Sequence, residues 1–215
     1  MHSQGQAREP SNPRSMPTTD DEIREKYLER AIRELNALAR ELQACPHCPR
    51  GQLAPVLGSG HPQADVFLIK HSARPSEIEE GVAFYGRAGN ALMKSLRRLA
   101  IDPLAVYGTL CVKCPVPDPA LADPACVSRL AEEIAIVQPK IIVVMGVEAL
   151  AVVSELDVPL QMDLQPLPGI QRFTPTIDAL YVPSIDDALD EEGAKREFWA
   201  AFRVLGQWWA DLPPY

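Results

Sequence analysis

The sequence predicts an α/β fold, a three-layer α/β/α sandwich around a mostly parallel, four-stranded sheet. Short apolar runs alternate along the chain with segments of helical periodicity, as in chains whose parallel strands are joined by crossover helices. The run PKIIVVMG (139–146) is nearly continuous Ile and Val, which is typical of a strand buried on both faces. The 215 residues, with 47% hydrophobic content, are long enough for one domain with a full core.

The chain opens with a polar, proline-rich stretch, and we expect residues 1–19 to be a disordered tail. The stretch has no apolar core region, so we expect no secretory signal and a cytoplasmic protein. A cap at Asp20 or Asp21 then precedes apolar residues at helical spacing, which predicts a helix ending near Gln43. The sequence has no run of about 20 apolar residues, so we expect no membrane helix.

The remaining elements follow in chain order, and residues 20–215 are expected to form a single domain. Strands are expected at 66–69, 105–111, 139–146 and 180–183. Helices are expected at 90–99, 127–137, 146–156 and 191–209. The segment 163–178 lacks periodicity and is expected to be a loop.

The cysteines suggest a metal centre. Cys45-x2-Cys48 lies in one proline-containing loop, and Cys114 and Cys126 bound another. Structural disulfides are rare in cytosolic proteins, so four thiols in loops favour a bound metal. Their spacing does not choose between zinc and an iron–sulfur cluster, and four unrelated core and loop cysteines are the alternative. Cys111 lies within a strand pattern and is interpreted as a small buried hydrophobe.

A second candidate site lies at the carboxyl end of the sheet. The stretch 64–114 runs from a strand through a charged loop and a glycine turn (86–89) into a helix, a common way to build a site at a sheet edge. The net charge of −8 excludes a protein coated in basic surface for nucleic acid. A local basic cleft is still compatible with the cations Arg74, Arg87, Lys94, Arg97 and Arg98.

Taken together, these motifs resemble the iron–sulfur uracil-DNA glycosylases of the family-four type. The resemblance covers about 45–209 and includes C-x2-C after the first helix and ADVFLI (64–69). It continues through G-x-x-F-x-GRAG (81–89), VY-x-T-x-x-VKC (106–114), PKIIVVMG-x-x-A (139–149) and AKREFW (194–199). The motifs are specific as a set, and none would be specific alone.

The resemblance implies the sandwich fold of those enzymes and DNA with a base turned out of the stack as the substrate. Phe84 would stack on that base, although without the family a core role would be preferred. Leu110 would lie at the base-reading position, and Gly86 and Arg87 would contact DNA. A [4Fe-4S] cluster would be bound by Cys45, Cys48, Cys114 and Cys126. We expect a monomer.

The sequence departs from the family at the positions that have catalytic or base-reading roles there. Relatives carry a GEAPG-like segment where this chain has residues 70–74, so His71 replaces an acidic residue. Leu110 replaces an asparagine, and Asp186 replaces a histidine near the chain end. We therefore expect divergent chemistry with His71 and Asp186 as a catalytic acid–base pair. An ordinary surface histidine beside solvated charges is the alternative.

Three functions stay open at this point. The first is a DNA glycosylase that hydrolyses an N-glycosidic bond by altered chemistry. The second is a catalytically silent iron–sulfur module that binds DNA or protein. The third is an iron–sulfur redox or sensing protein.

Overall fold

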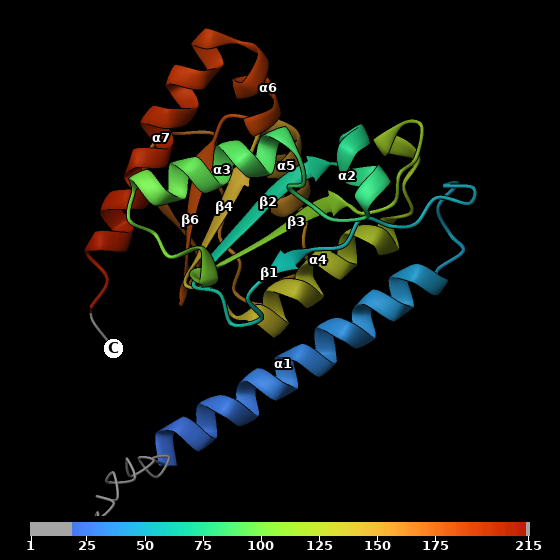
Figure 1. Ribbon diagram of the computed structural model, residues 1–215, viewed down its shortest axis with the longest axis horizontal. Coiled ribbons are helices and arrows are strands. Elements are labelled where there is room, and N and C mark those ends of the chain that lie inside the picture. The colour runs from blue at the N-terminus through green and yellow to red at the C-terminus, as the bar shows by residue number, and fades with distance from the viewer. Residues whose placement is uncertain (1–18, 214–215) are drawn as a thin grey trace, which may run out of the picture.

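The computed structural model describes residues 19–213, in which helices cover both faces of one mixed sheet (Figure 1). The strands of this described part are β1 (Ser59–Gly60), β2 (Val66–Ser72), β3 (Val106–Val112), β4 (Ile141–Met145), β5 (Ile170–Thr174) and β6 (Ile177–Val182). The helices are α1 (Thr19–Ala44), α2 (Pro75–Glu80), α3 (Arg87–Arg98), α4 (Pro124–Val137), α5 (Val147–Ser154), α6 (Ile185–Asp190) and α7 (Glu192–Ala210). The tail expected over residues 1–19 lies outside the described residues, apart from Thr19, where α1 begins.

The sheet has the strand order β1-β3-β2-β4-β6-β5 in the part of the chain that the structure describes. The inner strands β3, β2, β4 and β6 are parallel, while β1 and β5 pair antiparallel at the two edges. The expected sheet of four strands is therefore corrected to six. The expected loop 163–178 contains β5, whose first three residues are exposed or half-buried, so it gives no buried apolar run.

Side chains of the parallel strands alternate between two cores. Val66 and Leu68 of β2 pack with residues of α3, α6 and α7. Phe67 and Ile69 of the same strand pack with residues of α4 and α5. This alternation, with both faces buried, explains the continuous apolar runs of the sequence.

Two short helices lie in segments with no expected element. Pro75 opens α2 inside the charged loop, because its fixed φ suits the first turn of a helix. Ser184 caps α6, accepting a hydrogen bond from the N–H of Asp187 at 3.3 Å. Both helices have six residues, too few to show a periodic pattern. They matter here because they border the same edge of the sheet.

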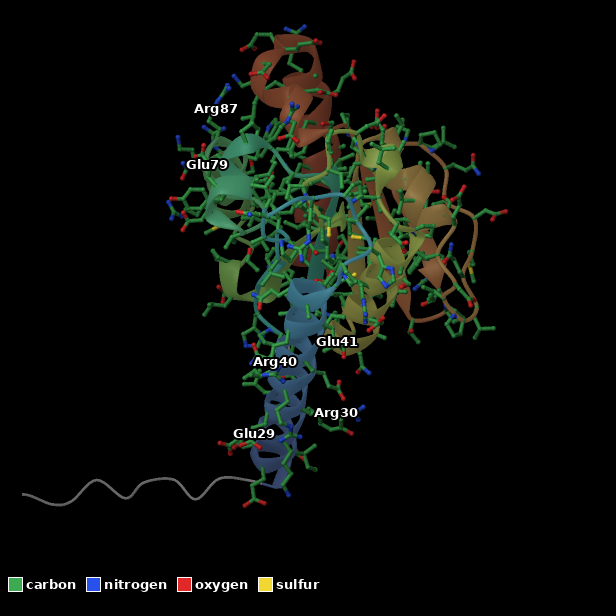
Figure 2. The ribbon with its side chains drawn as sticks, turned by 90° about the vertical axis from the view of Figure 1, so that its right-hand side faces the viewer. Glu29, Arg30, Arg40, Glu41, Glu79 and Arg87 are labelled. Carbon is green, nitrogen blue, oxygen red and sulfur yellow. The ribbon has the colours of Figure 1, made fainter. Side chains whose placement is uncertain are left out.

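Helix α1 packs against α4 through its C-terminal half, where Leu38 and Leu42 are buried and Glu41 pairs with Arg129 at 2.7 Å. Its first turns, which precede Glu29 and Arg30, are exposed and extend away from the body (Figure 2). Among the described helices, none combines the length and the apolar character that crossing a membrane requires.

Candidate functional site

Three of the four predicted metal ligands lie together. The Sγ atoms of Cys48, Cys114 and Cys126 are all within 4.8 Å of one another, and the three side chains are buried. Cys45 is half-buried on the same loop as Cys48 and lies outside that group. Cys111 is fully buried on β3, and burial raises the pKa of its thiol to about 12, as suits a residue of the core.

Local structure explains how these thiols meet. Cys114 follows β3, Cys126 lies in the first turn of α4, and Cys48 belongs to the loop after α1. The N–H of Asp123 donates to the Sγ of Cys48 at 3.3 Å. A hydrogen bond with Cys114 lowers the pKa of the Cys126 thiol to about 5, with help from the nearby charge of Lys113. Buried thiols with N–H donors around them suit soft, thiolate-bound metals, so the donor set fits such a group.

A buried ion pair lies beside these thiols. Lys113 Nζ is 2.6 Å from an Oε2 of Glu133 on α4, and both side chains are almost inaccessible. Lys113 also donates to the Thr109 hydroxyl at 2.7 Å and to the carbonyl of Leu110 at 2.8 Å. The Tyr107 hydroxyl donates to Glu133 at 3.1 Å. The network therefore fixes the end of β3 to α4.

The alternation of β3 explains this arrangement. Tyr107 and Cys111 belong to the core beneath α4, and Thr109 and Lys113 point toward Glu133 on that helix. Leu110, two residues from Gly108, faces the opposite core. One face of β3 thus contributes side chains to the ion pair beside the thiols. Its other face packs in the core that contains Phe84.

The carboxyl end of β2 carries a second buried ion network. Lys70 Nζ is 2.7 Å from Glu77 Oε2 and 3.1 Å from Asp186 Oδ2. The side chains of Lys70 and Glu77 are 3% and 1% exposed, so this ammonium group lies away from bulk water. Arg74 Nε is 3.2 Å from the same oxygen of Asp186. The carboxylate of Asp186 is therefore neutralised from two sides.

Glu77 also orders the loop that contains Phe84. Its carboxylate accepts hydrogen bonds from the backbone N–H groups of Arg74 and Phe84. Phe84 has φ = 60°, a left-handed conformation that is uncommon outside glycine and needs such support. Without Glu77, the loop would lose two hydrogen bonds, one of them at its strained residue Phe84.

The Phe84 ring is largely buried and borders a small cavity of about 160 Å³. The residue is 8% exposed, and Lys70 Nζ lies 5.7 Å from the ring centroid. On β3, a Cβ at Gly108 would come within 2.7 Å of the ring, so only glycine allows this approach. Leu110, at the predicted base-reading position, is fully buried in the same core.

His71 and Asp186 lie near the same edge but make different contacts. The ion-pair partners of Asp186 among the described residues are Lys70 and Arg74, and His71 is not one of them. Burial lowers the pKa of His71, an effect partly opposed by the negative charge of Glu148. The imidazole therefore stays neutral at neutral pH, while Lys70 provides the positive charge beside Asp186.

A cavity of about 390 Å³ opens directly beside this network. Arg87, at the start of α3, borders it and binds the carbonyl of Leu189 at 3.2 Å and the carboxylate of Asp190 at 3.1 Å. Arg87 lies on the same flank as Glu79 (Figure 2). The lining residues are Arg74, Pro75, Ser76, Glu77, Tyr85, Gly86, Arg87, Ala88, Asp186, Leu189 and Asp190.

Sequence reasoning missed Lys70, Glu77, Lys113 and Glu133 as parts of these sites. A signal existed for the two lysines, because each follows an apolar strand segment at a position that the strand pattern predicts to be buried. A buried lysine requires a partner, so extending each expected strand over its lysine would have predicted a carboxylate nearby. The sequence does not show which carboxylate that is, because the partners belong to other elements of the fold.

Comparison with known proteins identifies the family of this chain. The family model of the uracil DNA glycosylase superfamily matches residues 57–203. A type-4 uracil-DNA glycosylase of Pyrobaculum aerophilum is 29% identical over 130 residues, covering 58% of this chain and 65% of the relative. The type-4 enzyme of Sulfurisphaera tokodaii is 32% identical over 119 residues, covering 52% and 54%. That of Thermotoga maritima is 28% identical over 123 residues, covering 54% and 64%.

The matched regions thus span between about half and just under two thirds of these relatives' length. The family model, in contrast, covers well over half of this chain and includes β2, β3, β4, β6 and most of α7. On that match, the chain belongs to the uracil-DNA glycosylase superfamily.

Proposed function

We propose that this protein acts in DNA base-excision repair, binding a DNA strand with one nucleotide turned out of the stack and hydrolysing its N-glycosidic bond by altered chemistry. Membership of the superfamily supports the substrate class. The observation that carries the proposal is the Lys70–Glu77–Asp186 network, which opens onto the 390 Å³ cavity at the carboxyl edge of the sheet. The proposal includes a cytoplasmic monomer in which residues 20–215 act as one domain.

The charges of this network suit the separation of charge in the reaction. When the glycosidic bond breaks, positive charge develops on the sugar and negative charge on the departing base. The Asp186 carboxylate, which borders the cavity, would accept a proton from the attacking water. The buried Lys70 ammonium would stabilise the anionic base, because fixed charges act strongly away from water.

Lys70 also explains how a carboxylate can occupy this position. A carboxylate in the place of the family's histidine would repel a departing anion. Here Lys70 and Arg74 lie 3.1 Å and 3.2 Å from Asp186 and balance its charge. In the proposed mechanism Lys70 therefore takes the electrostatic role of the family's late histidine. The pairing of His71 with Asp186 stays a prediction without a contact to support it.

We expect purified protein to release a free base from DNA containing uracil, hypoxanthine or xanthine. The measurement is chromatography of the released base, with single-stranded and duplex substrates in parallel. Asp186→Asn should reduce release strongly, because it removes the proposed proton acceptor. Asp211→Asn, at the exposed end of α7, is the matched control. Normal release by Asp186→Asn would contradict the mechanism.

One observation favours the silent binding module as the second candidate. Lys70 Nζ lies over the Phe84 ring, 5.7 Å from its centroid, so a base could not stack on that face without displacing it. Binding of DNA without release of any damaged base would establish this function in place of hydrolysis. The base-release assay therefore separates the two candidates directly.

We further propose that Cys45, Cys48, Cys114 and Cys126 bind a [4Fe-4S] cluster, which would serve as a structural brace between the loop after α1, the end of β3 and the start of α4. Three of the thiols already lie within 4.8 Å of one another. Cys45, three residues before Cys48, is the proposed fourth ligand.

Metal analysis tests this cluster. Protein purified without oxygen should contain about four iron atoms and four sulfides per chain. Cys48→Ser should lose most of that iron, whereas Cys111→Ser should keep it, because Cys111 lies in the core of β3. Iron retained by Cys45→Ser would remove Cys45 from the ligand set, and zinc in place of iron would overturn the cluster.

A further inference from the structure

The cavity beside the ion network is bordered by an aromatic residue that the family resemblance does not use. Tyr85 is 49% exposed and lines this cavity, whereas its neighbour Phe84 is 8% exposed, packs against Lys70 and Gly108, and borders a separate, smaller cavity of about 160 Å³. A nucleobase can stack only on an aromatic face that it can reach. At this edge of the sheet, Tyr85 provides the accessible ring.

We propose that Tyr85, rather than Phe84, is the platform on which this protein stacks an unpaired nucleotide of a single strand. The inference deepens the proposed function, because it names the residue that holds the nucleotide and the form of nucleic acid that is bound. It does not require that any bond is broken.

The volume and the lining of the site suit one nucleotide. The cavity volume of about 390 Å³ lies in the range of small-ligand sites. Arg74 and Arg87 border the cavity together with Tyr85, so guanidinium groups are available to a phosphate or a base edge. Leu189 adds an apolar side chain to the lining.

The charges at the cavity indicate how the nucleotide would be held. Arg74 is paired with Asp186 and Arg87 with Asp190, so each cation near Tyr85 has an acidic partner. A balanced site gives little general attraction for a polyanion. Stacking on the ring must then supply most of the affinity, and stacking tolerates every base because each has a π-face.

Stacking on Tyr85 also predicts a preference for single strands over duplexes. A base in a duplex is paired and stacked, and must leave both arrangements before it can reach Tyr85. A base in a single strand has a smaller barrier to the same contact. The exposed face of Tyr85 therefore predicts tighter binding of single strands than of duplexes of the same sequence.

The test uses a short, undamaged single-stranded DNA that contains one 2-aminopurine. Stacking on Tyr85 should quench the fluorescence of this base on binding, and Tyr85→Leu should weaken binding about tenfold or more and abolish the quenching. Tyr85→Phe should retain both, because it keeps the ring. Tyr27→Leu, which alters a tyrosine that is 57% exposed on α1, should match the unchanged protein.

Salt dependence provides an independent measurement. With at most two phosphates contacted, by Arg74 and Arg87, the slope of log affinity against log salt should be about −1.4 or shallower. A much steeper slope would overturn a site held by stacking. Equal affinity for duplex and single strand, or unchanged binding by Tyr85→Leu, would overturn the proposal as well.

The outcomes are separate from those of the base-release assay. Undamaged DNA offers no lesion, so quenching that depends on Tyr85 supports this site even if no base is ever released. Conversely, Tyr85→Leu protein that still releases the base and binds single-stranded DNA with unchanged affinity would support the glycosylase activity. The same result would overturn the role of Tyr85 as the stacking platform. If RNA of the same sequence binds more tightly than DNA, and Tyr85→Leu still weakens that binding, the nucleotide site is supported and its ligand is RNA.

Discussion

Lys113→Met is expected to lower the free energy of unfolding by about 3–5 kcal/mol, the cost typical of removing one partner from a buried ion pair. The variant leaves the Glu133 carboxylate buried with only the hydroxyls of Tyr107 and Thr109 as donors. It also removes the hydrogen bond from Lys113 to the carbonyl of Leu110 at 2.8 Å. Urea denaturation followed by circular dichroism measures the change.

Two further variants make this measurement specific. Lys195→Met breaks an ion pair with Glu192 in which both side chains are mainly exposed, and it should have little effect. The double variant Lys113→Met/Glu133→Leu should recover much of the lost stability, because it no longer leaves a buried charge alone. A loss below about 1 kcal/mol in the single variant would show that Lys113 is not essential to this packing.

Lys70→Met is expected to reduce the rate of base release by a hundred- to a thousandfold, the effect typical of removing one electrostatic stabiliser of a transition state. The physical reason is that Lys70 is the buried cation beside both Glu77 and Asp186. Without it, two carboxylates would face each other and a departing anion. Single-turnover release of the base under saturating protein measures the change.

The same variant also disturbs a buried network, so its folding must be compared. Circular dichroism and affinity for undamaged single-stranded DNA report whether the cavity survives. Lys94→Met, on the exposed surface of α3, removes the same charge without touching the network and should release base at the unchanged rate. A folded, DNA-binding Lys70→Met protein with undiminished release would contradict the proposed role of Lys70.

The sequence predicted the parallel centre of the sheet because those strands are buried on both faces. Ile141 to Met145 are all inaccessible or nearly so, and their apolar run was readable without any partner. The edge strand β5 gave no such pattern, because it has a neighbour on one side only and begins with exposed residues. Two-residue β1 is too short for any periodicity.

The candidate site was less readable, since its members come from distant parts of the chain. Lys70 and Asp186 are 116 residues apart and meet only through the strand order of the folded sheet. Alternation along β2 adds a second reason. Neighbouring residues on a strand point to opposite faces, so Lys70 points toward Phe84 while its neighbour His71 feels the charge of Glu148. Alignment with the family's motif predicted His71 as the residue beside Asp186. In the structure the pleat of β2 places Lys70 there instead.

The alternation of β3 restricts how this protein can change. Lys113 and Cys111 face α4, while Leu110 faces the Phe84 core, and Phe84 itself lies against Gly108. A point substitution in β3 therefore alters one of the two sites and leaves the other untouched. Inserting or deleting a single residue before Gly108 would instead exchange the two faces, moving Leu110 toward the thiols and Lys113 toward the aromatic ring. A side-chain change in this strand thus affects one site at a time, whereas a change in its length affects both.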